Sequence, residues 1–288
     1  MDMKKITVAI VGSSGYIAKY LVNMLTKDKN INLIKIGRRI TDDIFFDISL
    51  VKNFDYEVLD NVDYIIFTAA ISSPDICEKD FIHAWNINVK GTGYFIENAL
   101  ARNCRIIFFS SDAVFANDSN EIFTELSKTN PKTLYGKMKK SIEDRFIDNK
   151  NFKSLRLSYV ISKNDKYMTY IFSCLNNNFI AEIYHPFYRN CIFIDDVIKT
   201  IQWLLYHWNE YSYSVLNLAG KELISRLRII DEVNRFLDKK ILYKIIHPNK
   251  DFYKNRPQIT QIKSIYLDMY KIIENINFSE KMKKELRK

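Results

Sequence analysis

The sequence predicts an α/β fold in which a doubly wound parallel sheet is joined to a smaller, interleaved C-terminal lobe. Apolar runs of strand length alternate with segments of helical period along the first 160 residues. Parallel strands need long crossovers, and strands that are buried on both faces are continuously apolar. Both observations therefore indicate one parallel sheet with helices on its two faces.

The expected elements can be assigned in chain order. The strands of the sheet are predicted at residues 6–11, 32–36, 63–68, 105–110 and 154–160. Beyond residue 160 the pattern loosens, and it predicts a helix, a strand and a helix at residues 194–208, 215–218 and 225–237. Because no Gly/Ser-rich linker or repeat separates the two parts, we expect the second lobe to be interleaved with the first domain.

Composition and charge exclude several classes of protein. The chain has 288 residues, 47% of them hydrophobic and 27% charged, as in ordinary globular proteins. It lacks an uncharged apolar run of about 18 residues and an apolar secretory core, so we expect a cytoplasmic protein without a membrane partner. The net charge is +9, but the basic residues are interleaved with acidic ones along most helices. This diffuse distribution argues against a nucleic-acid partner.

The cysteines and histidines give no sign of a metal site. The four cysteines form no Cys-x-x-Cys pair, and no histidine is spaced near them as a ligand would be. We therefore expect buried free thiols and no metal.

A glycine turn follows the first predicted strand and precedes a helical pattern. Glycine at position 12 permits a tight turn, and glycine at position 15 lets the backbone approach a pyrophosphate at the helix N-terminus. Ala18 is small enough for close packing of helix on strand. This strand, turn and helix predict a dinucleotide-binding domain formed by residues 1–160, with 191–220 returning to it. Residues 161–190 and 221–288 then form the smaller substrate-binding lobe.

The end of the second predicted strand indicates which dinucleotide is bound. Arg38 and Arg39 stand where proteins that prefer NAD(H) usually carry an acidic residue for the ribose hydroxyls. A guanidinium group matches a 2′-phosphate in charge and geometry. The pair favours NADP(H), with NAD(H) as the other option.

A second motif indicates acid–base chemistry on an alcohol or a ketone. Tyr135 and Lys139 are four residues apart, so on a helix they share a face. A cation beside the phenol is expected to lower its pKa and to suit it for passing a proton to a carbonyl oxygen. Ser111, at the end of the strand 105–110, could hold that oxygen by a hydrogen bond.

With these motifs the chain resembles the extended short-chain dehydrogenases/reductases, the NAD-dependent epimerase/dehydratase superfamily with a Rossmann-type fold. Within them it is most similar to the dTDP-4-dehydrorhamnose reductase branch. The matching stretches span most of the chain: residues 12–18, 47–48, 68–70, 77–78, 88–92, 110–115, 135–139, 156–158, 193–197, 217–220, 225–226 and 256–257.

The resemblance implies roles for individual residues. It places Tyr16 and Ile17 along the cofactor phosphates, Asp47 and Ile48 beside the adenine, and Ala69, Ala70 and Ile71 near the ribose. It implies that Ser111 binds the carbonyl, that Tyr135 donates the proton, and that Lys139 lies beside Tyr135 and binds the nicotinamide ribose. By the same resemblance Asn88 holds a helix kink and a water, and Asp112, Tyr159 and Arg256 contact substrate.

The expected function is NAD(P)H-dependent reduction of a nucleoside-diphosphate 4-keto-6-deoxy sugar. Ala113 replaces a tyrosine that is common in the reductase branch, which leaves the particular sugar open. An epimerase or dehydratase of the same fold is an alternative, since Asp112 is compatible with a dehydratase acid. A non-catalytic regulatory subunit is a second alternative, against which the intact serine, tyrosine and lysine argue. The sequence does not fix the oligomeric state, for which a homodimer is one expectation.

Overall fold

The computed structural model describes residues 5–115 and 121–288, which divide into two compact units. The first unit consists of the described residues within Met1–Val114, Thr129–Arg156 and Ile201–Leu216. The second unit consists of those within Phe115–Lys128, Leu157–Thr200 and Asn217–Lys288. The chain therefore passes between the units several times.

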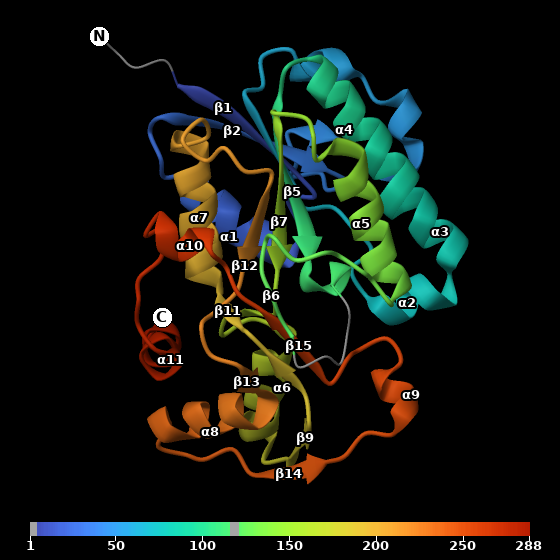
Figure 1. The fold of residues 1–288 in the computed structure, drawn as a ribbon. Helices are drawn as coiled ribbons and strands as arrows, with labels where there is room; N and C mark the ends of the chain where they lie inside the picture. The colour runs from blue at the N-terminus through green and yellow to red at the C-terminus, as the bar shows by residue number, and fades with distance from the viewer. Residues whose placement is uncertain (1–4, 116–120) are drawn as a thin grey trace. The chain divides into compact units, whose positions relative to one another are not determined.

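A seven-stranded sheet in the order β12-β7-β5-β4-β1-β2-β3 forms the centre of the first unit (Figure 1). Its strands are β1 (Ile6–Val11), β2 (Ile31–Gly37), β3 (Ile44–Phe45), β4 (Tyr64–Phe67), β5 (Arg105–Ser111), β7 (Phe152–Leu157) and β12 (Val215–Leu218). The pairs β1–β2, β1–β4, β4–β5 and β2–β3 are parallel. Strand order reverses between β1 and β4, as in a doubly wound sheet, and this confirms the predicted fold class.

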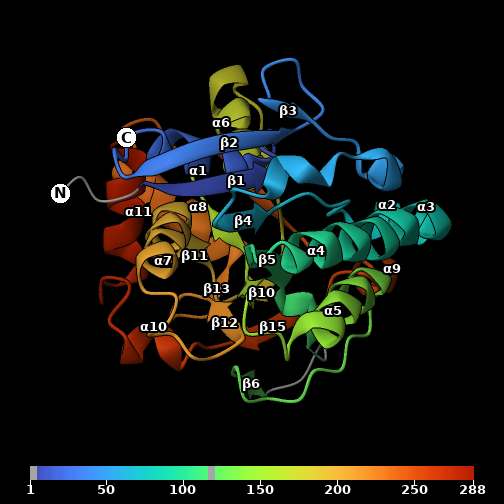
Figure 2. The same ribbon diagram turned by 90° about the horizontal axis from the view of Figure 1, so that it is seen from above.

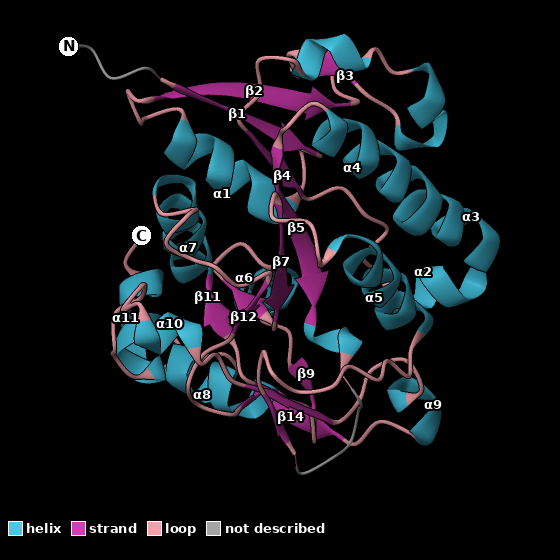
Figure 3. Ribbon diagram, turned by 45° about the horizontal axis from the view of Figure 1, so that its top comes forward, coloured by secondary structure: helices cyan, strands magenta, loops and turns pink. Residues whose placement is uncertain are grey.

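Helices lie on both faces of this sheet. α4 (Thr92–Ala101) and α5 (Leu134–Phe146) lie on one face, and α1 (Tyr16–Leu25) lies on the opposite face (Figure 3). α2 (Pro74–Lys79) precedes α3 (Phe81–Trp85), which continues through a π-helical turn at Asn86–Gly91 into α4 as one rod (Figure 2). Two 3₁₀ segments, Ile48–Asn53 and Tyr56–Leu59, follow β3, and a third, Asp112–Val114, follows β5.

The core of the first unit is rich in aromatic side chains. Phe67, Phe108 and Phe152 from three strands and Phe95 from α4 are almost fully buried. The rings of Phe108 and Phe152 stack with centroids 5.9 Å apart. Such rings bury large apolar areas, so they stabilise the packing of α4 and α5 against the sheet.

The second unit is built from short strands and helices around its own core. Its strands are β6 (Ile122–Phe123), β8 (Val160–Ile161), β9 (Ala181–Tyr184), β10 (Tyr188–Arg189), β11 (Ile192–Phe193), β13 (Ile224–Ser225), β14 (Tyr243–Ile246) and β15 (Ile259–Ile262). Its helices are α6 (Lys166–Asn177), α8 (Arg226–Phe236), α9 (Lys250–Tyr253), α10 (Tyr266–Met269) and α11 (Phe278–Leu286), with the start of α7 (Ile194–Tyr206). The buried side chains of α6, α8 and α11 share one apolar cluster.

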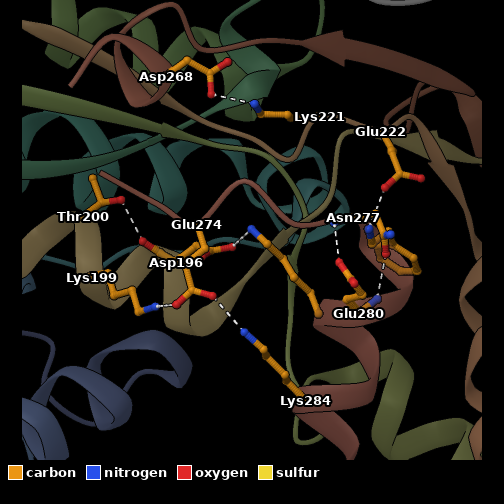
Figure 4. A network of polar contacts seen from close by, with 12 residues as sticks. Asp196, Lys199, Thr200, Lys221, Glu222, Asp268, Glu274, Asn277, Glu280 and Lys284 are labelled. Atoms are coloured by element: carbon orange, nitrogen blue, oxygen red, sulfur yellow. Dashed lines mark hydrogen bonds and ion pairs between the residues drawn. The ribbon is translucent and has the colours of Figure 1, made fainter. Parts of the chain in front are cut away.

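Polar contacts attach the C-terminal segment to the start of α7 within this unit (Figure 4). Glu274 accepts hydrogen bonds from Lys199 at 2.7 Å and from Lys284 at 2.8 Å. Asp196 pairs with Lys281 at 2.5 Å, and both side chains line a cavity of about 500 Å³. These contacts fix α11 against α7.

Two sequence predictions need correction in detail. The apolar run 154–160 is not one strand: β7 ends at Leu157, and Val160–Ile161 forms β8, which pairs with β11. One continuous run therefore serves two sheets. In addition, the described residues of 115–128 group with the second unit, because β6 pairs with β15 and the Glu125 carboxylate accepts hydrogen bonds from Ser264 Oγ at 2.6 Å and Ile265 N at 2.9 Å.

Two further features concern the thiols and the helix lengths. Cys77, Cys104, Cys174 and Cys191 are free and buried, as predicted. Among the helices in residues 5–115 and 121–288, none combines the length and the apolar character needed to cross a membrane.

Candidate active site

The glycine turn after β1 has the features of an anion-binding turn. Gly12 has a φ of 83°, in the left-handed region that favours glycine. A Cβ there would lie 2.9 Å from backbone atoms of Ala69, just after β4, so the two strand ends approach closely. Gly15 is the N-cap of α1 and provides no side-chain cap, which leaves the first amides of the helix to bind an anion. The turn therefore fits a pyrophosphate group, with Tyr16 and Ile17 as the first residues of the helix.

The loop after β2 contains a carboxylate that no sequence motif indicated. Asp42 Oδ2 accepts a hydrogen bond from Arg39 N at 2.8 Å, and Asp42 Oδ1 accepts one from the Ser13 hydroxyl in the glycine turn. A Cβ on Gly37 would lie 2.6 Å from the same carboxylate. Asp42 is five residues beyond the end of β2, so only the folded loop brings it back to the strand end.

The two predicted arginines lie at the surface around this loop. The Arg38 side chain is 74% exposed, and its Nη1 lies 3.9 Å from Asp47 Oδ2. Arg39 is exposed. Long, exposed side chains of this kind can turn toward a phosphate, and the carboxylate of Asp42 lies on the same loop. The loop thus carries both charge signs beside the turn.

Asp47 and Ile48 stand at the start of the first 3₁₀ segment. Asp47 caps this segment, accepting hydrogen bonds from Ser49 Oγ at 2.7 Å and Ser49 N at 2.9 Å. These bonds, followed by the charge of Arg38, hold the pKa of Asp47 below its ordinary value despite partial burial. Ile48 packs against the core of the first unit, and a Cβ on Gly91 would lie 2.8 Å from its carbonyl oxygen.

Asn88 fixes the loop that follows β4. Its Oδ1 accepts a hydrogen bond from Ile71 N at 2.8 Å, and its Nδ2 donates to Ile71 O at 2.9 Å. Nδ2 also contacts Cys77 Sγ at 3.8 Å and Met138 Sδ at 3.5 Å. Asn88 lies in the π-helical turn. Its side chain therefore connects this turn both to the loop that contains Ala69, Ala70 and Ile71 and to Met138 on α5.

Ser111, Asp112, Tyr135 and Lys139 come from neighbouring parts of the first unit. Ser111 Oγ donates to Asp112 Oδ1 at 3.0 Å and accepts from Ala113 N at 3.2 Å. Gly136 is essential to this arrangement, since a Cβ there would collide with the carbonyl oxygen of Ala113. α5 can therefore begin directly against the segment after Ser111, with Tyr135 in its first turn.

Lys139 is buried beneath Tyr135 on the same helix face. Its Nζ donates to Phe109 O at 2.6 Å and lies 4.6 Å from the centre of the Phe108 ring and 5.8 Å from that of Tyr135. Burial lowers the pKa of Lys139 to about 8, and the negative charge of Glu143 opposes this shift.

The expectation that Lys139 lowers the pKa of Tyr135 is wrong for this structure. Burial raises the pKa of the Tyr135 phenol, and the nearby charge of Asp112 raises it further. The physical reason is the direction of the ammonium group, which is hydrogen-bonded to the strand β5 rather than to the phenol oxygen. Tyr135 is therefore protonated at neutral pH, as a proton donor must be.

The predicted substrate residues Tyr159 and Arg256 belong to the second unit. The Tyr159 hydroxyl donates to Asp165 Oδ1 at 2.8 Å, and the Arg226 guanidinium lies 5.9 Å from the centre of the Tyr159 ring. Arg256 lies 5.1 Å from the ring centre of Phe252, and burial lowers its pKa. The Tyr159 hydroxyl is thus already engaged by a buried carboxylate.

Comparison with known proteins identifies a family and a curated relative. The model of the RmlD substrate binding domain family matches residues 6–287. A dTDP-4-dehydrorhamnose reductase from Aggregatibacter actinomycetemcomitans is 26% identical over 133 residues, which are 45% of this chain and 43% of that protein. This alignment thus spans less than half the length of that relative.

Solved structures match over nearly the entire chain. The dTDP-4-dehydrorhamnose reductase of Bacillus anthracis in complex with NADP has a TM-score of 0.85 at 16% identity, covering 100% of this chain and 99% of that one. The UDP-glucuronic acid 4-epimerase of Bacillus cereus, in complex with UDP-glucuronic acid and NAD, has a TM-score of 0.81 at 19% identity, covering 97% and 98%. At these identities the structures establish the shared fold. The family match over residues 6–287 shows that the chain belongs to the RmlD substrate binding domain family, in the dTDP-4-dehydrorhamnose reductase-like branch of the extended short-chain dehydrogenases/reductases.

Proposed function

We propose that this protein is an NADP(H)-dependent reductase of a nucleoside-diphosphate 4-keto-6-deoxy sugar. The observation that carries the proposal is the cluster of Ser111, Tyr135 and Lys139 in the unit that also contains the glycine turn. The family and the named reductase relatives support the same reaction class.

The proposed roles follow from the protonation states and contacts of the three residues. A phenol with a raised pKa keeps its proton until a basic oxygen develops, so Tyr135 can donate to the carbonyl oxygen of the sugar. The Ser111 hydroxyl is held by Asp112 and Ala113. By rotating away from Asp112 it can donate its one hydrogen bond to the same carbonyl oxygen, beside the bond from Tyr135. Lys139 has N–H donors beyond the one bound to Phe109, and these suit ribose hydroxyls.

The first unit fits a nicotinamide dinucleotide. A Cβ at Gly12 would fill the approach between the ends of β1 and β4, and the uncapped start of α1 provides amides for a pyrophosphate. When bound, the reduced cofactor would supply the hydride for the carbonyl carbon. Ala69, Ala70, Ile71, Asp47 and Ile48 are the proposed contacts to its ribose and adenine.

Two features of one loop act in opposite directions on the proposed preference for NADP(H). Arg38 and Arg39 can bind a 2′-phosphate, whereas the Asp42 carboxylate would repel it. We expect Arg38→Ala with Arg39→Ala to weaken NADPH binding more than NADH binding. We expect Asp42→Asn to strengthen NADPH binding. Dissociation constants from fluorescence titration measure both effects, and an unchanged NADPH/NADH ratio in the double variant would refute the role of the arginines.

The reductase and the alternative functions differ in what happens to the cofactor. Purified protein is mixed with NADPH and a panel of nucleoside-diphosphate 4-keto-6-deoxy sugars, and absorbance of the reduced nicotinamide is followed. A reductase consumes NADPH in proportion to sugar. An epimerase or dehydratase converts sugar without net consumption, and a regulatory subunit does neither, so either result would overturn the proposal.

Further aspects of the proposal concern the rest of the molecule. The second unit is the proposed substrate-binding lobe, and Tyr159 and Arg256 are its proposed substrate residues. Asp112 is the proposed substrate residue of the first unit. Because the Tyr159 hydroxyl is bonded to Asp165, we assign only its ring to the substrate. A cytoplasmic location and a homodimer remain predictions, and light scattering of the purified protein measures the latter.

A further inference from the structure

α5 is fixed to the central sheet by a buried ion pair one turn beyond Lys139. Glu143 and Arg156 have side chains that are only 2% and 5% exposed. Arg156 Nη2 lies 2.7 Å from Glu143 Oε2, and Arg156 Nε lies 3.1 Å from both carboxylate oxygens. Ser154 Oγ donates to Glu143 Oε1 at 2.8 Å. The carboxylate is thus held by two residues of β7 through four hydrogen bonds.

This contact belongs to the same helix face as the proposed catalytic groups. Tyr135, Lys139 and Glu143 are spaced four residues apart, so they follow one another along the inner face of α5. Lys139 attaches this face to β5 through Phe109 O, and Glu143 attaches it to β7. Two neighbouring strands therefore fix the rotation and the height of the helix, and with them the position of the phenol.

The charge of Glu143 also acts on Lys139. Among the described residues, Tyr135 and Glu143 on α5 and Cys77 on α2 are the titratable groups that act on Lys139 or lie beside it. Burial is the largest influence on the pKa of Lys139 and lowers it, and the carboxylate of Glu143 is the next largest and raises it. Removing that charge should leave the amine easier to deprotonate.

Stability alone does not account for such a pair. Burying two charges has a desolvation cost that their attraction and hydrogen bonds only offset, and packed apolar residues often stabilise a fold equally well. A bidentate pair, by contrast, defines one geometry.

We propose that Glu143 is a positioning residue, which Arg156 and Ser154 hold in place, and which fixes α5 and supports the ammonium group of Lys139. The proposal rests on the proposed function, because it assigns Lys139 to the reaction. It is independent of the identity of the sugar.

The first test measures Lys139 directly and needs no substrate. Protein labelled with ¹³C at the lysine ε-carbon is titrated by NMR, and the Lys139 signal is assigned by its loss in Lys139→Met. Glu143→Gln should lower the pKa of Lys139, and Glu143→Asp should retain most of the wild-type value. Glu97→Gln is the matched control, because it breaks the exposed ion pair that Glu97 on α4 makes with Arg145 on α5. It should not change the pKa of Lys139. An unchanged Lys139 titration in folded Glu143→Gln would overturn the electrostatic role.

The second test separates position from charge. Arg156→Lys keeps both charges of the pair but loses the bidentate hydrogen bonds of the guanidinium group. It also tests the positioning role if Glu143→Gln does not fold. On a sugar that the wild type reduces, the kcat of Arg156→Lys should fall on the order of 10- to 100-fold with KM little changed, because a small displacement of a reacting group is costly. A wild-type kcat in Arg156→Lys would overturn the positioning role. A wild type that reduces no 4-keto sugar would instead refute the proposed function, while the NMR result would stand.

Discussion

Tyr135 and Lys139 show how burial, rather than mutual contact, sets the protonation of a tyrosine and lysine pair. The ammonium group of Lys139 is directed at the Phe109 carbonyl, and the phenol of Tyr135 is under the influence of Asp112. Desolvation favours the neutral form of each group, which raises the pKa of the phenol and lowers that of the amine. A neutral phenol at physiological pH is what reduction of a ketone requires.

At this scale we predict that Tyr135→Phe removes turnover while leaving the fold intact. The variant lacks the only proton that we assign to the carbonyl oxygen, so kcat should fall roughly 10²- to 10⁴-fold. NADPH consumption with an accepted 4-keto sugar measures the loss. Tyr206→Phe is the control, because it removes a phenol that donates to Asp28 outside the proposed site. Full turnover in Tyr135→Phe would refute the assignment.

At the scale of elements, the sequence predicted the strands of the central sheet well, apart from the end of the run 154–160, and it predicted the two-residue strands poorly. β1 and β12 have the predicted bounds, because most of the residues in each are apolar and lie in the sheet. The Ser225 cap places α8 one residue inside its predicted start. Strands of two residues such as β6 and β10 contain too few side chains for any periodicity.

The candidate site was predictable where its parts are local in sequence. The glycine turn and the tyrosine–lysine spacing each lie within one element and its cap. Asp42 could not be predicted, since its contact with Ser13 depends on how the loop after β2 folds back. The Glu143–Arg156 pair joins two elements and has no local signal. The direction of the Lys139 ammonium likewise depends on a strand far away in the sequence.

A prediction at this scale concerns the junction of β1 and α1. Gly12→Ala forces a Cβ onto a residue with φ of 83°, within 2.9 Å of the Ala69 backbone. It should weaken NADPH binding and lower the free energy of unfolding by about 1–3 kcal/mol. Gly93→Ala in α4 is the control, because its Cβ would collide only with the flexible end of Arg145 and would make an ordinary contact with Ile142 Cδ1 at 3.6 Å. Calorimetric NADPH binding and urea unfolding measure the two effects, and wild-type affinity in Gly12→Ala would contradict this account of the turn.

For the whole molecule, the chain crosses between its two units so often that neither is a contiguous segment. The sequence indicated such interleaving, since no linker interrupts it. The apolar run that divides into β7 and β8 marks one of these crossings, and a run of uniform hydrophobicity gives no sign of where the division falls.

The stability of the whole fold should depend on pH through a buried lysine in the first unit. Lys153 donates to the carbonyls of Tyr211 and Tyr213, and burial lowers its pKa to about 8 from 10.5. The unfolded chain therefore binds more protons between these values, so this group makes the unfolding free energy rise as pH increases from about 8 toward 10.5. Urea unfolding across this range should show a smaller rise in Lys153→Met than in the wild type. Identical pH dependence in the two proteins would count against the shift.

The proposed reaction delivers a hydride and a proton to the ketone of a nucleotide sugar. To follow the hydride, NADPH that carries deuterium at nicotinamide C4, in each stereochemical position, is supplied, and the sugar is analysed by mass spectrometry and NMR. We expect one deuterium at C4 of the product from one of the two labelled cofactors, with equal oxidation of NADPH. Product without deuterium from either cofactor, or no product with any 4-keto sugar, would contradict it.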